Sequence, residues 1–399
     1  GRSLRLFLCL PQGSSAVFLL FTKMFKRSLD LKNTDIKQHN QHLSYGWSSD
    51  WDNKLAQMPV STRPLSPARV IAQHSHSYQI MTPEGEHTAT VTGKYEFNAA
   101  LKSDFPAVGD WVMAEKLPGE TRSVIHSLLP RQSAMIRKAA GSTVDDQVVG
   151  ANMDYLFITN ALNQDFNIRK MERYLIAAWE SGASPVILLT KADLCDDPEA
   201  FAASMESAAP GVPVHLISAL QNQGKEQLLP YLQPGKTIAV TGSSGVGKST
   251  LLNWLAGDNI METQGIREND ARGRHTTTHR ELFLLPGGAL VMDTPGMREL
   301  QLWDAQEGLE QAFSDIEELA ANCRYRDCRH ETDPGCAVRQ AIDNGLLEAK
   351  RLHNYKKTAK ELSRLARKEN SIAKKAKKAA GSSTRKSIRG TKTEAWDYD

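Results

Sequence analysis

The sequence predicts an α/β protein in which a parallel sheet is preceded by a small β-barrel and followed by a helical module. Three observations lead to this fold class. Short β-branched segments fill residues 68–130, apolar runs alternate with helical segments over residues 145–302, and three cysteines and a histidine lie between helical segments after residue 303. With 399 residues, the chain is long enough for several domains with cores of their own.

The composition is that of a soluble globular protein, with 40% hydrophobic and 24% charged residues. The apolar runs near the beginning, "LRLFLCL" and "AVFLLF", are shorter than the roughly 18 residues of a membrane span. We expect no membrane association, a natural start at Met24, and residues 1–23 to be upstream translation. Residues 24–62 are polar and lack helical periodicity, so we expect residues 1–64 to form a flexible extension.

Residues 65–135 are predicted to form an OB-like β-barrel. Segments such as "EHTATVTGKYEF" and "GDWVMAEKL" are short and alternate in polarity, and Gly85 and Gly119 mark turns between them. Short strands with regular turn signals are typical of small barrels. Barrels of this kind often bind RNA, and a purely structural β-domain is the alternative.

Residues 136–302 are predicted to form a parallel sheet covered by helices on both faces. Continuous apolar strands that alternate with helical segments indicate this arrangement. The predicted strands are "DYLFIT" (154–159), "PVILLT" (185–190), "VPVHLIS" (212–218), "TIAVTG" (237–242) and "ALVMDT" (289–294). Ligands of such sheets bind at the carboxyl ends of the strands, and every motif below follows a strand.

A phosphate-binding loop follows the strand at 237–242. The loop comprises Gly242, Ser243, Ser244, Gly245, Val246, Gly247, Lys248, Ser249 and Thr250. Its glycines let backbone N–H groups converge on phosphate oxygens, aided by the N-terminus of the following helix. We expect Lys248 to reach the β- and γ-phosphates and Ser249 to ligate Mg²⁺. The alternative, a chance glycine-rich turn, does not explain the strand before the loop and the helix after it.

A guanine-reading motif follows the strand at 185–190. It consists of Thr190, Lys191, Ala192 and Asp193. The Asp193 carboxylate can accept hydrogen bonds from guanine N1–H and its 2-amino group, which adenine lacks, and the Lys191 stem can cover the base. Ser218 and Ala219 follow the next strand and can offer a backbone N–H to guanine O6. The alternative is that Asp193 caps a helix.

The strand at 289–294 supplies a D-x-x-G motif. Asp293 is the predicted carboxylate on the Mg²⁺ side, and Gly296 can offer its backbone N–H to the γ-phosphate. The order of motifs, with the guanine motif ahead of the phosphate loop, is a circular permutation of the usual GTPase order. The chain therefore leaves the sheet soon after Gly296 and enters the cysteine-containing module, which ties a γ-phosphate-sensitive segment to that module.

The segment "RGRHTTTHREL" (272–282) holds the candidate switch residues. Any of its three threonines could complete the Mg²⁺ shell, and we favour Thr277. Met297 follows Gly296 where many GTPases carry a glutamine that orients water, so another group must orient the attacking water. His275 is the candidate, and the alternative is an ordinary solvated histidine.

The cysteine cluster is predicted to be a structural zinc site within a helical domain at 303–370. Its ligands are Cys323, Cys328, His330 and Cys336. Three thiolates and one imidazole form a closed tetrahedral Zn²⁺ site without an open catalytic position. The alternative is three reduced cysteines packed near a histidine. The arginines among the ligands, Arg324, Arg326 and Arg329, could contact RNA.

The end of the chain is strongly basic. From Lys350 to Lys392 there are sixteen Lys and Arg residues against two Glu, and the rest of the chain is mildly acidic. This asymmetry predicts a polyanionic partner such as RNA, with a solvated tail as the alternative. Residues 371–399 are Lys/Ala-rich and then Gly/Ser-rich, which predicts disorder in isolation.

From about residue 40 onward the chain resembles the circularly permuted ribosome small subunit-dependent GTPase A family (RsgA, also YjeQ/YloQ). The segments that carry the resemblance are "TKAD", "GSSGVGKST", "GRHTTTH", "DTPG" and "CRYRDCRHETDPGC". Thr190 departs from the pattern, since asparagine is common there. The resemblance implies a role for His275 and GTP hydrolysis stimulated by the small ribosomal subunit, late in its maturation.

We therefore expect a cytoplasmic GTPase that binds GTP, GDP and ribosomal RNA, with Mg²⁺ at the nucleotide and one structural Zn²⁺. Nothing in the sequence demands more than a monomer. Two other functions stay open: a GTP-dependent RNA-binding switch with incidental hydrolysis, and a P-loop ATPase, which Asp193 disfavours.

Overall fold

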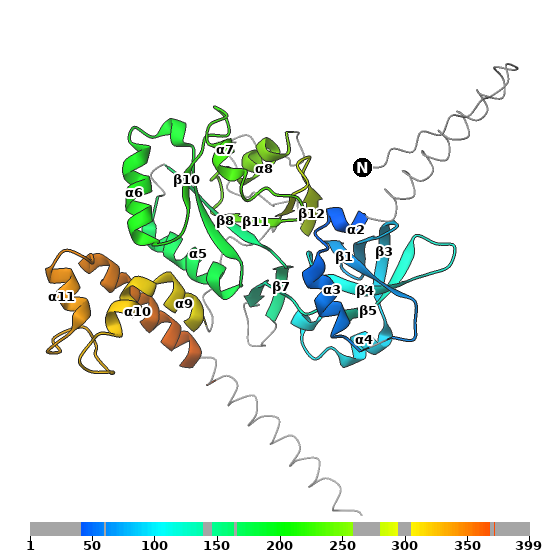
Figure 1. Cartoon of the computed structure of the whole chain (residues 1–399), viewed down its shortest axis with the longest axis horizontal. Helices are drawn as coiled ribbons and strands as arrows, with labels where there is room; N and C mark the ends of the chain where they lie inside the picture. The colour runs from blue at the N-terminus through cyan, green and yellow to red at the C-terminus, as the bar shows by residue number, and fades with distance from the viewer. Residues whose placement is uncertain are drawn as a thin grey trace, which may run out of the picture.

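The computed structural model describes residues 41–59, 61–138, 146–162, 166–257, 280–293, 305–367 and 371. Within these ranges the chain forms a β-barrel, an α/β domain and a helical module (Figure 1). The barrel lies beside the α/β domain next to β12, and the helical module lies on a different side of it, next to α5. The predicted fold class is confirmed.

The barrel has five strands whose pairing closes on itself. β1 pairs with both β2 and β4, and β3 runs parallel to β5. The interior is filled by Val70, Ile80, Val112 and Ile125, each fully buried. The elements are β1 (Leu65–Gln73), β2 (Tyr78–Thr82), β3 (Gly85–Val91), α4 (Gly93–Asn98), the 3₁₀ turn η1 (Lys102–Asp104), β4 (Trp111–Lys116) and β5 (Arg122–Leu128).

Residues 1–64 were expected to form a flexible extension, and for the described residues from 41 onward this prediction is wrong. Residues 41–58 instead contain helices α2 (Gln41–Ser44) and α3 (Ser49–Ala56), packed on the outside of the barrel. The indole rings of Trp47 and Trp51 lie 4.8 and 6.0 Å from that of Trp111, which is fully buried. Large aromatic side chains bury enough apolar area to hold a short helix that has little helical periodicity of its own.

The α/β domain contains the predicted parallel sheet. Its strands run in the order β10-β9-β8-β11-β13-β12, and only β12 is antiparallel to its neighbour β13. One apolar cluster, which includes Leu175 and Ile187, covers one face, and another, which includes Leu188 and Leu251, covers the other. The strands are β8 (Tyr155–Ala161), β9 (Ser184–Thr190), β10 (Val214–Leu216), β11 (Thr237–Gly242), β12 (Arg280–Leu284) and β13 (Leu290–Asp293). The helical elements are α5 (Ile168–Glu180), the 3₁₀ turn η2 (Ala192–Leu194), α6 (Pro198–Ala208), α7 (Lys225–Leu228) and α8 (Lys248–Ala256).

The barrel and the α/β domain share one sheet of eleven strands. Ala72 and Gln73 of β1 pair with Glu281 and Arg280 of β12. A separate hairpin of β6 (Ala134–Lys138) and β7 (Asp146–Ala151) follows the barrel in the chain. The strand in which the candidate switch segment ends, β12, is therefore bonded to the barrel through its backbone.

The helical module packs against α5. It contains α9 (Gln306–Ala312), α10 (Ser314–Ala320), α11 (Ala337–Asp343) and a helical stretch over residues 349–367. α9 approaches α5 so closely that a Cβ on Gly308 would lie 2.3 Å from the Ile176 carbonyl oxygen. Only glycine fits this contact, which fixes the module against the α/β domain.

Candidate nucleotide site and metal centre

The phosphate loop connects β11 to α8, as the sequence predicts. Gly242, Gly245 and Gly247 have φ values of 146°, 78° and 93°, a region that favours glycine. A Cβ on Gly242 would lie 2.3 Å from the Thr159 carbonyl oxygen. Gly247 is the N-cap of α8, while Ser244 and Gly245 are exposed. The loop is therefore open to solvent at the point where backbone N–H groups precede a helix, a suitable site for an anion.

Lys248 closes the base of this loop. Its ammonium Nζ donates to the carbonyl oxygens of Gly242 at 2.9 Å and Ser243 at 2.6 Å. Ser249 and Thr250 are half-buried in the first turn of α8. The ammonium group thus lies across the loop, where a phosphate oxygen could replace its carbonyl partners.

The guanine motif lies beside the phosphate loop. The Thr190 hydroxyl, at the end of β9, donates to the Val246 carbonyl oxygen at 2.7 Å. Lys191 has a φ of 57°, and this left-handed residue turns the chain into η2, which holds Ala192 and Asp193. The departure from asparagine at position 190 therefore still leaves a side chain that bonds the two loops together.

Ser218 and Ala219 lie next to the guanine motif. The Ala192 N–H donates to the Ile217 carbonyl oxygen at 3.3 Å, which joins the two loops. Ser218 is 1% exposed, and its hydroxyl accepts a hydrogen bond from the Gln221 N–H at 3.2 Å. Ala219 is half-buried.

The structure gives no support to the helix-cap interpretation of Asp193. Helix α6 is capped by Asp197, whose carboxylate accepts from the Ala200 N–H at 3.2 Å. Asp193 is half-buried, and no hydrogen bond joins its side chain to another described residue. Its carboxylate is thus left available for a ligand.

The remaining predicted residues are less fully described. The backbone of Asp293 ends β13, and β13 is a parallel neighbour of β11, so the two strands end at the same edge of the sheet. His275, Thr277 and Gly296 lie outside the described residues. The structure therefore unites the phosphate loop, the guanine motif and Ser218-Ala219, and the roles of the others stay predictions.

Two residues of this site were not predicted from the sequence. Thr159 ends the apolar part of β8, and its hydroxyl donates to the Thr241 carbonyl oxygen at 2.6 Å. Tyr174 of α5 is buried and hydrogen-bonds Ser243; burial raises the pKa of its phenol, and that hydrogen bond lowers it in part. Thr159 could have been found from the sequence, because it is the polar residue at the end of the predicted strand 154–159. Nothing in the sequence marks Tyr174 as part of the site.

The four predicted zinc ligands lie together. The ligand atoms of Cys323, Cys328, His330 and Cys336 are all within 4.8 Å of one another. His330 Nδ1 lies 3.6 Å from Cys323 Sγ and 3.4 Å from Cys336 Sγ, and the two sulfurs are 4.0 Å apart. Tetrahedral Zn²⁺ with ordinary bond lengths requires about 3.6 Å between nitrogen and sulfur and about 3.8 Å between sulfurs. The cluster fits one zinc ion.

Backbone N–H groups donate to two sulfurs of the cluster, those of Cys323 and Cys336. Burial acts to raise the pKa of the Cys323 thiol, but N–H groups of Val338 and Ala337 help to bring its pKa below the ordinary value. The Arg339 N–H donates to Cys336 Sγ at 3.4 Å, which places this sulfur at the N-terminus of α11. Such N–H groups stabilise the charged sulfur that a metal needs.

A turn brings the last ligand, Cys336, back to the others. Gly335 has a φ of 75°, and the Arg324 N–H donates to its carbonyl oxygen at 3.1 Å. Asp333 supports the turn, because its carboxylate accepts from the Arg329 N–H at 3.1 Å.

Across the described ranges, no helix is both long enough and apolar enough to cross a membrane.

Comparison with known proteins agrees with this arrangement. A family model described as RsgA GTPase matches residues 128–303, and a second, described as 50S ribosome-binding GTPase, matches residues 237–371. Small ribosomal subunit biogenesis GTPase RsgA 2 of Lactiplantibacillus plantarum is 47% identical over 295 residues, which are 74% of this chain and 83% of that protein. The RsgA protein of Opitutus terrae is 42% identical over 331 residues, covering 80% and 90%.

Solved structures share the fold. YjeQ from Thermotoga maritima aligns with a TM-score of 0.57 and 26% identity, over 75% of this chain and 98% of that one. YloQ, described as a circularly permuted GTPase, aligns with a TM-score of 0.56 and 24% identity, over 77% and 98%. The permuted order is present here, since the strand of the guanine motif, β9, precedes that of the phosphate loop, β11. The chain therefore belongs to the RsgA GTPase family and is a GTP-hydrolysing enzyme with a circularly permuted fold.

Proposed function

We propose that this protein hydrolyses GTP to GDP and phosphate during late maturation of the small ribosomal subunit, and that the subunit stimulates hydrolysis. The observation that carries the nucleotide part is the hydrogen bond from Thr190 to Val246, which joins the guanine motif to the phosphate loop. The subunit is proposed because the relatives are named small ribosomal subunit biogenesis GTPases.

The described loops can hold both ends of GTP. Backbone N–H groups of residues 243–249 would bind the phosphates, and Lys248 would exchange its carbonyl partners for β- and γ-phosphate oxygens. Asp193 would accept from guanine N1–H and the 2-amino group, with the Lys191 stem over the base. The backbone at Ser218-Ala219 would donate to guanine O6.

Three residues would hold Mg²⁺: Ser249, Asp293 and Thr277. When bound, the ion neutralises charge on the β- and γ-phosphate oxygens. His275 would orient the attacking water, because Met297 has no hydrogen-bonding group for this task. The Gly296 N–H would bind the γ-phosphate and make the segment after β13 sensitive to its presence.

The flanking domains would bind ribosomal RNA. The barrel, the exposed arginines Arg324, Arg326 and Arg329 beside the zinc ligands, and the basic end of the chain are the proposed contacts. One structural Zn²⁺ would hold residues 323–336 in shape. We propose a cytoplasmic monomer.

A second function shares these features. A GTP-dependent RNA-binding switch, whose own hydrolysis is incidental, would also use exposed arginines and a basic end of the chain, since neither feature selects one RNA. The two functions differ in what the small subunit does to the hydrolysis rate.

The test is the rate of GTP hydrolysis by the purified protein, alone and with purified small ribosomal subunits. The Lys248→Ala variant is the control, because it removes the ammonium group at the phosphates and leaves the RNA-binding domains intact. We expect strong stimulation that disappears in the variant. Tight guanine-nucleotide binding without stimulation would overturn the proposed partner and favour the switch.

A further inference from the structure

The helical stretch over residues 349–367 sorts its cations by face. All exposed residues from position 350 to its end are basic except Ser363. They form what we call the cationic stripe: Lys350, His353, Lys357, Lys360, Arg364 and Arg367. Successive members are three or four residues apart, so they lie on one side of the helix, over a length of roughly 26 Å.

The inner face of the same helix has its charges paired. Arg351 is 5% exposed and donates to Asp315 at 2.8 Å and Glu172 at 3.2 Å. Glu361 is the one acidic residue over 349–367, and it lies 2.6 Å from Arg173 of α5. These contacts fix the rotation of the helix, and the cationic stripe therefore faces solvent.

No member of the cationic stripe has an ion-pair partner among the described residues. Like charges three and four residues apart destabilise a helix, and solvated helices usually interleave both signs. A polyanion that binds along the stripe would remove this repulsion.

We propose that the cationic stripe binds the phosphate backbone of double-stranded RNA, independently of sequence. Apart from the single imidazole of His353, the stripe has no aromatic side chain on which an unpaired base could stack, and it has no asparagine or glutamine to read base edges. Regularly spaced Lys and Arg side chains contact phosphates and position a protein on a duplex. A membrane is a poor match, because the apolar side of this helix, with Leu352 and Leu362, is buried in the protein.

This proposal rests on the proposed function, in which ribosomal RNA is the partner, and it assigns one surface to that RNA. Its test is binding of the full chain to a short RNA duplex of arbitrary sequence between about 50 and 200 mM salt. The variant Lys357→Gln/Lys360→Gln is compared with Lys170→Gln/Lys236→Gln. All four lysines are exposed, and the control pair removes the same charge from the α/β domain, to which no RNA contact is assigned.

On a duplex, a plot of log affinity against log salt has a negative slope. Each lost phosphate contact makes that slope shallower by about 0.9. We therefore expect the stripe variant to bind more weakly and its slope to be shallower than the native slope by about 2. The control pair should keep the slope of the native protein. The Lys357→Arg/Lys360→Arg variant should keep the native slope, since the charge is preserved. Basal GTP hydrolysis should be the same in all variants, which shows that they fold.

An equal loss in the stripe and control variants, or no loss in either, would overturn the proposal. So would a stripe variant that loses stimulation by small subunits yet binds the duplex normally, which would assign the stripe to an acidic protein. These outcomes are separate from the proposed function. Duplex binding that depends on the stripe supports this proposal even if small subunits do not stimulate the native protein.

Discussion

The α/β domain is joined to its two neighbours in different ways. The barrel shares backbone hydrogen bonds with it through β1 and β12. Among the described residues, the helical module shares no strand with it and is held by hydrogen bonds from Arg351 to Glu172 of α5 and to the Ala208 carbonyl oxygen of α6. The candidate switch segment, residues 272–282, runs into β12, so any movement of that strand acts directly on the barrel.

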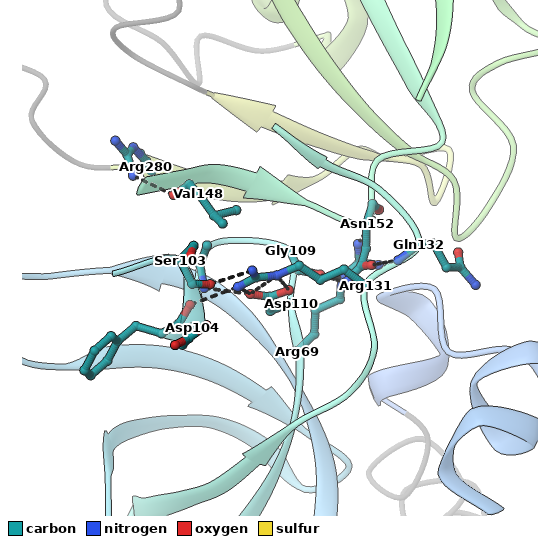
Figure 2. Close-up of polar contacts among 12 residues, drawn as sticks. Arg69, Ser103, Asp104, Gly109, Asp110, Arg131, Gln132, Val148, Asn152 and Arg280 are labelled. Carbon is teal, nitrogen blue, oxygen red and sulfur yellow. Dashed lines mark hydrogen bonds and ion pairs between the residues drawn. The ribbon is translucent and has the colours of Figure 1, made fainter. Parts of the chain in front are cut away.

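Figure 2 shows polar contacts where the barrel meets the α/β domain. Arg131 makes hydrogen bonds of 2.7–3.2 Å to the Asp110 carboxylate and also donates to the Ser103 and Phe105 carbonyl oxygens. Burial raises the pKa of Asp110, and the hydrogen bonds from Arg131 oppose that rise. Next to this pair, Arg69 donates to the carbonyl oxygens of Gly109 and Asn152, each at 3.1 Å.

The other junction depends on Arg351. Its guanidinium donates to the carboxylates of Glu172 and Asp315 and to the carbonyl oxygens of Ala208 at 2.6 Å and Ala312 at 2.8 Å. The comparison teaches that the barrel should move together with the sheet, because backbone hydrogen bonds join them. The position of the module depends instead on a few charged groups and on its metal. Three changes test this difference, and the zinc ion comes first.

Removing zinc with a strong chelator should unfold residues 323–336 and leave guanine-nucleotide binding intact. Structural zinc contributes about 10–16 kcal/mol in small zinc-binding peptides, and no strand of the described ranges links this segment to the sheet. Hydrogen exchange of this segment, with and without chelator, measures the effect. The Cys195→Ser variant is the control and should behave as the native protein, because Cys195 lies outside the cluster. Unchanged protection after metal removal would contradict the zinc assignment.

Arg351→Met should lower the free energy of unfolding by about 3–5 kcal/mol, because it leaves Glu172 buried without its cation. Urea denaturation measures the change. Arg173→Met is the matched control and should cost about 0–1 kcal/mol, since the Arg173–Glu361 pair is about one-third exposed. Adding Glu172→Met to Arg351→Met should recover part of the loss. Equal effects of Arg351→Met and Arg173→Met would show that the module is not held by the buried network.

Arg69→Met should have a smaller effect, about 1–3 kcal/mol. Arg69 donates to the carbonyl oxygens of Tyr45, Gly109 and Asn152 and to the Thr237 hydroxyl, so its loss leaves neutral acceptors rather than a charge. Burial lowers the pKa of Arg69 to about 10, which shows that burying its charge is unfavourable. The substitution removes this buried charge, and that gain offsets part of the lost hydrogen bonding.

The matched control for Arg69→Met is Arg63→Met, in which an exposed arginine paired with Glu115 is lost. We expect this control to change the unfolding free energy by less than about 1 kcal/mol. If Arg69→Met proves more damaging than Arg351→Met, the barrel junction depends on side chains as much as the other one does.

Much of the fold and of the nucleotide site could be predicted because the signals are local. The apolar runs, the glycine spacing of residues 242–247 and the ligand spacing of residues 323–336 each define a short element by themselves. The order of these motifs along the chain, with the guanine motif before the phosphate loop, also indicates the circular permutation.

The rest depends on contacts between distant segments. The pairing of Gln73 with Arg280 has no sequence signal, because each strand is compatible with many neighbours. Arg69 lies in an apolar strand, and only the structure shows that its guanidinium is fully buried. α3 was not predicted, because its burial comes from aromatic contacts of Trp51 rather than from helical periodicity.

The most direct test of the central claim compares GTP hydrolysis with purified small and large ribosomal subunits at equal RNA phosphate concentration. The comparison is needed because one matching family model is described as a 50S ribosome-binding GTPase. The account predicts strong stimulation by small subunits and little by large ones. Equal stimulation by both, or stimulation by large subunits alone, would contradict it.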